Sequence, residues 1–220
     1  MKLATQLIFL LTLALPFFTL AQTAPEFMVS WRADSYVPPG YEGKALPSAG
    51  TRVTMSVELV DNGRLVDLSN QEIRWLINSR DLQAGLGRQT ISLVVDSIRS
   101  SQKVYITIAD YKGANISHLV TIPRVPPEVV ITSLAPGQII SPGLHMITGR
   151  PFFFNVEKIG DLEFFWSANG ETLVGSDNLS QIELDTTQVP GGSRINLALL
   201  IRNIMNPREN ASRSIILTSQ

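Results

Sequence analysis

Two tryptophans in equivalent places show that the sequence repeats itself. Trp75 and Trp166 lie 91 residues apart (166 − 75 = 91), and Asn78 and Asn169 keep the same spacing. A gap-free match over three successive segments indicates two copies of one structural unit, each of roughly 90 to 100 residues. The apolar residues that share this spacing are Ile91/Leu93 with Ile182/Leu184, and Val104/Ile106/Ile108 with Ile195/Leu197/Leu199.

Upstream of the tryptophans the match needs a different spacing. Met55-Val57-Leu59 aligns better with Phe152-Phe154-Val156, which begins 97 residues further on (152 − 55 = 97). The first copy is therefore predicted to carry six extra residues before its tryptophan (97 − 91 = 6). They fit the polar stretch around Asp61-Asn62-Gly63, where a hairpin loop tolerates insertion.

Apolar and polar residues alternate along most of the chain after residue 25, as in sheets with one buried face. Turn residues separate these runs, for example at Gly85-Leu86-Gly87 and Asn169-Gly170. The pattern predicts strands near 27–33, 51–60, 71–78, 89–96, 102–109 and 116–122 in the first copy, and near 128–134, 144–148, 151–157, 162–168, 180–185, 194–202 and 213–218 in the second.

Two copies of this length and strand number have the size of immunoglobulin-like β-sandwiches. We predict an all-β chain with two tandem domains of this kind, at 22–123 and 128–220. Residues 124–127 form a proline-rich linker, which is expected to act as a semi-rigid spacer. Trp75 and Trp166 are expected to fill the cores of their domains, because an aromatic residue that recurs at one place in each repeat indicates packing.

The motif Trp-x-x-Asn followed by Ser or Gly, at Trp75 to Ser79 and Trp166 to Gly170, resembles the third strand and following turn of bacterial immunoglobulin-like and PKD-like extracellular domains. The chain lacks the paired cysteines of antibody domains and the Gly-Asp-Gly turn of typical PKD domains. The resemblance covers residues 25–220 as a pattern. It implies an extracytoplasmic spacer or adhesion module.

The first 21 residues have the pattern of a secretory signal peptide. Lys2 precedes an apolar stretch from Leu7 to Ala14, and small residues precede a cleavage site after Ala21. A retained anchor is the alternative, although the stretch is short for a membrane span and contains Pro16. We therefore expect a secreted or extracytoplasmic protein, in the periplasm or at the cell surface, with no membrane span in the mature chain.

Composition and motifs argue against several functions. The chain has no cysteine, which excludes disulfides and thiol chemistry, and its net charge of −1 argues against nucleic acid as a partner. His118 and His145 lie far apart without metal-site spacing, and no hydrolase or phosphate-binding motif occurs. We therefore predict no catalytic, cofactor-binding or metal-binding residues, no cofactor, and no enzymatic activity.

The segment from Tyr36 to Pro47 is the most unusual part of the chain, because it is rich in proline, glycine and tyrosine. Tyr36, Tyr41 and Lys44 are candidates for a partner-binding loop, since exposed tyrosines bury area at low entropic cost. The alternative is a long connection whose prolines protect a sheet edge from aggregation. The partner of such a loop would be a protein or an envelope polymer, and the sequence does not identify it.

Three functions therefore stay open. The first is a non-catalytic binding or structural module of the bacterial envelope. The second is a periplasmic chaperone or a component of pilus or appendage assembly, which a bare sheet edge would favour. The third is a secreted carbohydrate-active enzyme with its site at the domain junction, which converging acids or histidines would favour.

Overall fold

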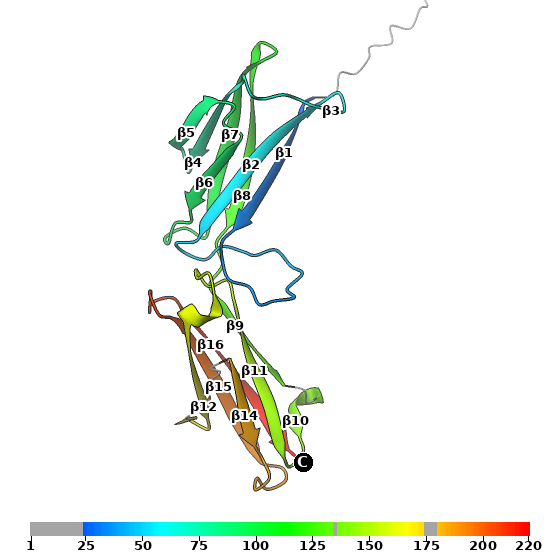
Figure 1. The fold of residues 1–220 in the computed structure, drawn as a ribbon, viewed down its shortest axis with the longest axis vertical. Coiled ribbons are helices and arrows are strands. Elements are labelled where there is room, and N and C mark those ends of the chain that lie inside the picture. Colours follow the sequence, from blue (N-terminus) through cyan, green and yellow to red (C-terminus); the bar gives the residue numbers. More distant parts are fainter. Residues whose placement is uncertain (1–23, 134–135, 174–179) are drawn as a thin grey trace, which may run out of the picture.

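The computed structural model describes residues 24–133, 136–173 and 180–220, and within them the regular secondary structure is almost entirely β-strand. Two sandwiches follow one another along the long axis of the molecule (Figure 1). The predicted signal peptide lies outside the described residues. The strands of the first sandwich are β1 (Glu26–Ala33), β2 (Arg52–Asp61), β3 (Arg64–Leu65), β4 (Glu72–Ile77), β5 (Arg80–Leu86), β6 (Thr90–Val94), β7 (Ser101–Tyr111) and β8 (Ala114–Pro123).

In its described residues, the second sandwich contains eight further strands and two short 3-10 helices, η1 (Pro136–Gln138) and η2 (Ile159–Asp161). Its strands are β9 (Glu128–Ser133), β10 (Ile139–Ile140), β11 (Leu144–Phe152), β12 (Leu162–Ala168), β13 (Glu171–Thr172), β14 (Gln181–Asp185), β15 (Arg194–Asn203) and β16 (Asn210–Ser219).

The two sandwiches share one strand order. In the first, β2 lies between β1 and β6 and also pairs with β3, and the facing sheet has the order β5-β4-β7-β8. In the second, β11 lies between β9 and β14, and the facing sheet has the order β13-β12-β15-β16-β10. Two facing sheets in this order are an immunoglobulin-like sandwich, so the predicted fold class is confirmed. One difference is that β10 pairs in parallel with β16.

Each sandwich has its own core, with a tryptophan on its third strand. Trp75 is 0% exposed, and its indole N–H donates a hydrogen bond to the Arg88 carbonyl at 2.8 Å. Trp166 is 4% exposed and packs over Gly149, where a Cβ atom would lie 3.0 Å from the indole Cζ2 and closer still to Leu199. The indole therefore occupies the space that a side chain at this position would fill.

The turn after each tryptophan is also equivalent. Asn78 and Asn169 both have a left-handed backbone, with φ of 48° and 51°. The peptide N–H of Asn78 donates to the Lys103 carbonyl, and its Oδ1 accepts from the Lys103 N–H. Asn169 makes the same two bonds with Asn196. The Trp-x-x-Asn motif thus places an asparagine where its side chain and backbone together hold the neighbouring strand.

The strand pairing corrects two of the predicted alignments. Met55 and Ile147 lie opposite Ile91 and Ile182, so Met55 corresponds to Ile147 and the predicted insertion of six residues is wrong. The second correction concerns Ile106, which the sequence matched with Leu197. Trp75 faces Ile106 whereas Trp166 faces Leu199, so Ile106 corresponds to Leu199, two residues from the predicted match. A shift of two keeps every side chain on its face, so alternation alone does not detect it.

Two strand predictions also change. The segments 144–148 and 151–157 are not separate strands, because β11 runs unbroken to Phe152 and the chain then leaves the sheet. Pro151 is tolerated inside β11 because β11 has a partner on one side only at this point. β14 pairs with β11 only as far as Thr148, whereas β9 continues alongside Pro151. Gly85 and Leu86 belong to β5 rather than to a hairpin tip.

The buried carboxylate of Asp61 links the ends of β2 and β7, at the end of the first sandwich that lies away from the second (Figure 1). Asp61 accepts a hydrogen bond from the Tyr111 hydroxyl at 2.6 Å and pairs with Lys112 Nζ at 2.5 Å. The hydrogen bond from Lys112, followed by that from Tyr111, lowers the pKa of Asp61. The same carboxylate raises the pKa of both Tyr111 and Lys112.

We expect Asp61→Asn to remove part of the pH dependence of stability. Because the folded pKa of Asp61 lies below the ordinary value of 3.8, its contribution is present above pH 3.8 and is lost as pH falls through the folded pKa. Thermal unfolding should therefore separate the native protein from the variant at pH 7, and the two melting temperatures should converge as the pH falls below the folded pKa of Asp61. An unchanged gap between the two melting temperatures across this range would contradict the assignment.

Candidate binding site at the junction of the two sandwiches

The loop between β1 and β2 leaves the first sandwich and docks on the second (Figure 1). The peptide N–H of Tyr36 donates to the Phe154 carbonyl at 2.8 Å, and the Phe153 N–H donates to the Tyr36 carbonyl at 2.7 Å. The Tyr36 side chain is half-buried against the second core, and this burial raises the pKa of its hydroxyl. Tyr36 therefore joins the two sandwiches.

Tyr41 lies further along the same loop and is 39% exposed. Its ring contacts Phe152 and Phe153 edge-on, with ring centroids 5.4 and 6.2 Å apart. Edge-to-face contacts of this kind hold an aromatic ring in one orientation. Tyr41 is thus an exposed aromatic residue on a firm apolar support.

A groove of about 360 Å³ runs between this loop and β11. Its charged members, Glu42 and Arg150, are exposed and lie beside the aromatic rings. A site with an oriented aromatic face, a cation and an anion can bind a polar chain, because stacking and charged hydrogen bonds act together. The full lining is Pro38, Pro39, Gly40, Tyr41, Glu42, Gly43, Arg150 and Phe152.

Lys44 points back to the first sandwich. Its Nζ lies 3.3 Å from the ring centroid of Trp31 on β1, a cation–π contact. Partial burial lowers the pKa of Lys44. The structure therefore brings Tyr41 to the groove but places Tyr36 and Lys44, the other two candidates from the sequence, in contacts within the chain.

A buried polar cluster fixes the junction from the other side. The Glu209 carboxylate accepts from the Ser48 hydroxyl (2.8 Å), the Asn155 N–H (2.8 Å) and Asn203 Nδ2 (2.6 Å). Ser48 belongs to the β1–β2 loop, whereas the other three residues belong to the second sandwich. Glu209, Ser48 and Asn203 are all buried, so these bonds join the two sandwiches in a water-poor setting.

The linker is also tied to its surroundings. The Arg124 N–H donates to the Ser100 carbonyl at 2.8 Å, and the Val125 N–H donates to the Pro47 carbonyl at 3.0 Å. Backbone bonds on both sides and the prolines that follow restrict the linker. The junction is thus held by the loop, the Glu209 cluster and the linker together.

The histidines take part in separate local contacts. His118 stacks on Phe27 with ring centroids 5.4 Å apart, and His145 Nε2 lies 2.7 Å from the Ser141 carbonyl. Across residues 24–133, 136–173 and 180–220, no group of three or more His, Cys, Asp or Glu residues could hold a metal ion.

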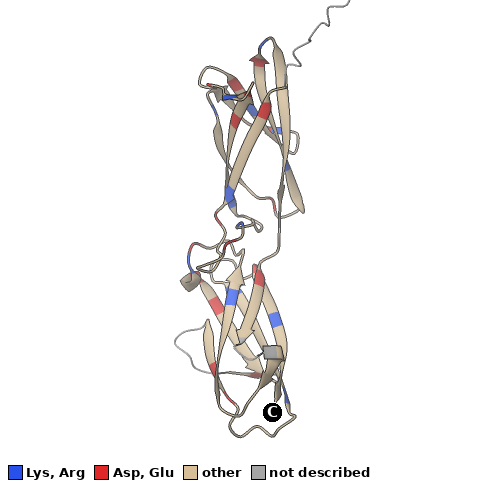
Figure 2. Cartoon of the chain, turned by 90° about the vertical axis from the view of Figure 1, so that its right-hand side faces the viewer, with Lys and Arg blue, Asp and Glu red and all other residues tan. Residues whose placement is uncertain are grey.

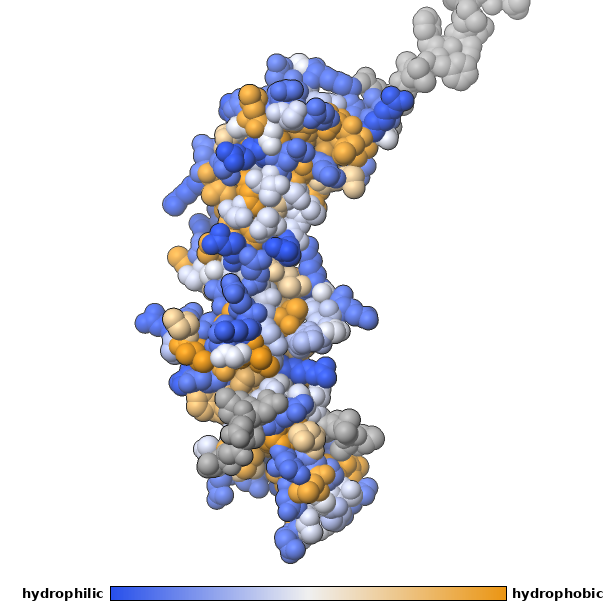
Figure 3. Space-filling model, in the orientation of Figure 1, coloured by the Kyte–Doolittle hydropathy of each residue, from blue (hydrophilic) through white to orange (hydrophobic). Residues whose placement is uncertain are grey.

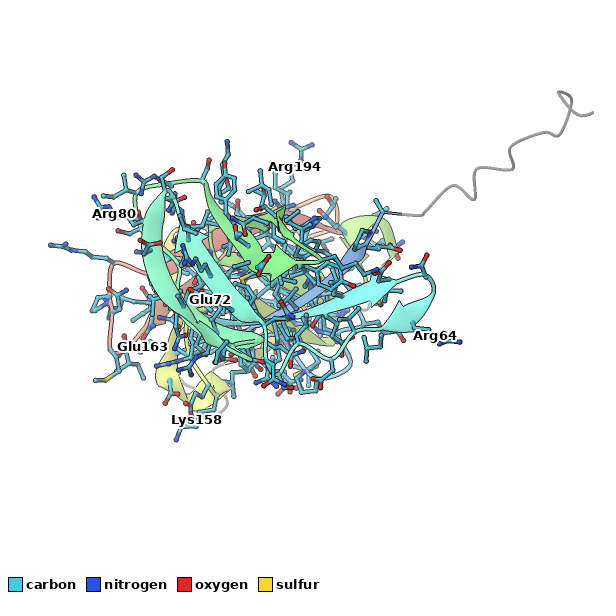
Figure 4. All side chains as sticks on the ribbon, turned by 90° about the horizontal axis from the view of Figure 1, so that it is seen from above. Arg64, Glu72, Arg80, Lys158, Glu163 and Arg194 are labelled. Atoms are coloured by element: carbon cyan, nitrogen blue, oxygen red, sulfur yellow. The ribbon has the colours of Figure 1, made fainter. Side chains whose placement is uncertain are left out.

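Among the residues that the structure describes, charged side chains are scattered over both sandwiches without one large patch of either sign (Figure 2). Seen along the long axis, Arg64, Arg80, Lys158 and Arg194 project outward on different sides (Figure 4). Apolar side chains are likewise exposed in separate groups on the face in Figure 3. In the part of the chain that the structure describes, no helix has the length and apolar character needed to cross a membrane.

No family model matches this chain, and neither does any curated protein. Among solved structures, it is similar to the three N-terminal domains of the highly immunogenic outer capsid protein of bacteriophage RB49, with 12% identity and a TM-score of 0.44 over 89% of this chain and 59% of that one. It is also similar to fibronectin(III)-like modules of Clostridium thermocellum CbhA, with 10% identity and a TM-score of 0.31 over 88% and 94%. The Ig1-2 module of the Drosophila receptor protein tyrosine phosphatase DLAR matches with 12% identity and a TM-score of 0.28 over 90% and 100%.

Proposed function

We propose that this protein is an exported, non-catalytic binding module of the bacterial envelope, and that it grips a protein segment or an envelope polymer in the groove at the junction. The observation that carries the proposal is Tyr41, which is exposed yet held in place by two phenylalanines. A rigid aromatic side chain loses little entropy when a partner covers it, which is why such residues dominate binding energies. Arg150 and Glu42 supply the polar contacts that orient the partner.

The rigid junction supports this proposal. The groove is lined by residues of both the β1–β2 loop and β11, so its shape depends on how the two sandwiches are held. Preorganisation of this kind strengthens binding because less order has to be created on association. The Glu209 cluster therefore serves the groove as well as the fold.

Tyr41→Ala should weaken partner binding by tenfold or more, because it removes the aromatic face and leaves the fold intact. The measurement is titration of the mature protein with purified envelope polymers and with extended peptides, followed by affinity comparison for every ligand that binds. Phe165→Ala is the matched control, since Phe165 is 40% exposed but lies on β12, in the sheet opposite β11 and away from the groove. Equal affinity of native protein and Tyr41→Ala would contradict the groove, and conversion of a polymer to products would favour the enzyme alternative.

A further inference from the structure

β8 is a long edge strand without a partner on its outer side. It pairs with β7 along its whole length, from Ser101 opposite Pro123 to Tyr111 opposite Ala114, and no other described strand pairs with it. The neighbouring strand β1 reaches it through the stacking of Phe27 on His118 rather than by backbone pairing. In the second sandwich the equivalent strand, β16, is covered at one end by β10. A row of free peptide groups such as that of β8 is a template for another strand.

β8 also lacks the features that usually protect an edge. It contains no Asp, Glu, Lys or Arg, and its only proline is the last residue, Pro123. Other edge strands carry charges, as β5 does with Arg80 and Asp81 and β14 with Glu183 and Asp185. β6 is uncharged but has half the length of β8. Since edges are normally protected against pairing, an uncharged edge of ten residues indicates that pairing is used.

An apolar row crosses the outer face of this sheet and ends at the free edge. Leu76 lies opposite Tyr105, and Tyr105 lies opposite Leu119 on β8. Leu119 is 43% exposed. The neighbouring row is polar, with the hydroxyls of Thr107 and Ser117 2.9 Å apart. An added strand would therefore need an apolar residue opposite Leu119 and small polar residues beside it.

We propose that the strand added to β8 is β8 of a second copy of this chain, in antiparallel pairing about a two-fold axis at Leu119. In this register the two Leu119 side chains meet and join both apolar rows into one band. Ser117 then faces Thr121 of the second copy, so hydroxyl meets hydroxyl and no like charges are opposed. A two-fold contact needs a self-complementary surface, and the sequence of β8 about Leu119 meets that condition.

The absence of cysteine from the chain allows a direct test with single-cysteine variants of residues 22–220. Leu119→Cys should form a disulfide-linked dimer on mild oxidation, because directly opposed residues lie within disulfide distance. Thr121→Cys should link at least tenfold more slowly, and combining it with Ser117→Cys should restore linking. Linking of Thr121→Cys as fast as that of Leu119→Cys would overturn the register.

Sedimentation equilibrium of the cysteine-free protein tests the association itself. Dimers are expected at concentrations on the order of 100 μM, and Leu119→Lys should weaken dimerisation at least tenfold by opposing two cations. Equal melting temperatures would show that this surface variant is folded. Tyr41→Ala should dimerise normally, so loss of groove binding and loss of dimerisation are separable. A native protein that stays monomeric at this concentration would overturn the proposal and would favour a strand of another protein on β8, as the chaperone or appendage-assembly alternative requires.

Discussion

Trp75→Ala is expected to unfold the first sandwich while the second stays folded. Truncation of a fully buried tryptophan costs about 3–5 kcal/mol, and a domain of this size is stable by only about 5–15 kcal/mol. The variant also leaves the Arg88 carbonyl without the indole N–H that it accepts from. Calorimetry of residues 22–220 should show one transition lost or shifted strongly downward. Trp166→Ala should have the same effect on the other transition.

Trp31→Ala is the control for these two variants, because Trp31 is only half-buried and packs at the margin of the first core. It should shift the first transition much less than Trp75→Ala. The domain boundaries 22–123, 124–127 and 128–220 stay predictions, and two separate transitions would support the division into two domains. A single transition that moves as a whole in both Trp75→Ala and Trp166→Ala would show that the sandwiches do not unfold independently.

Glu209→Ala is expected to detach the β1–β2 loop from the second sandwich. The change leaves three donors, from Ser48, Asn155 and Asn203, without their acceptor in a buried site. Hydrogen bonds to a charged group contribute about 1.5–3 kcal/mol each, so the loss is on the order of 3 kcal/mol or more. Hydrogen exchange should rise at Tyr36 and at 153–155, and small-angle scattering should show a wider range of shapes.

Glu209→Gln should behave similarly, although it keeps the shape of the side chain. Asn203 Oδ1 already accepts from the Met205 and Asn206 N–H groups, so the Asn203 amide is not free to turn and accept from a glutamine. The NH2 group of the new glutamine would then face the NH2 group of Asn203, and neither could accept a hydrogen bond from the other. Glu163→Ala is the control, because its ion pair with Arg202 is about 40% exposed and such pairs contribute little. Unchanged exchange in Glu209→Ala would contradict the role given to the cluster.

Much of the fold could be predicted because alternation and turn residues are local signals. The strands near 71–78 and 194–202 and the hairpin turn at Asn62-Gly63 are found where the sequence places them. The strand at 80–86 was missed because a bulge between Trp75 and Leu76 shifts the register of β5 and because Gly85 is typical of turns. Which residues of β7 and β15 correspond to each other depends on how the strands pack around the two indoles. That packing is tertiary, so no local sequence pattern contains it.

The site was less predictable than the fold. Composition identified the loop from Tyr36 to Pro47, and Tyr41 does line the groove. No sequence pattern points to Glu209, because its partner Ser48 is 161 residues away and neither residue belongs to a motif. The contact of Lys44 with Trp31 was equally hidden, since a cation–π pair depends on where a long loop folds back. Contacts between loops that are distant in the sequence can be identified only from the folded structure.

The locked junction has a consequence for avidity. If two copies pair through β8, stiff joints hold the two grooves at one fixed separation and orientation. A ligand that repeats its recognised unit at that spacing would bind the second groove at a high effective concentration, and its apparent affinity would rise without any new contact. A ligand with another spacing would engage one groove only. The same residues that stiffen a single chain would thus make a dimer selective for the periodicity of a polymer.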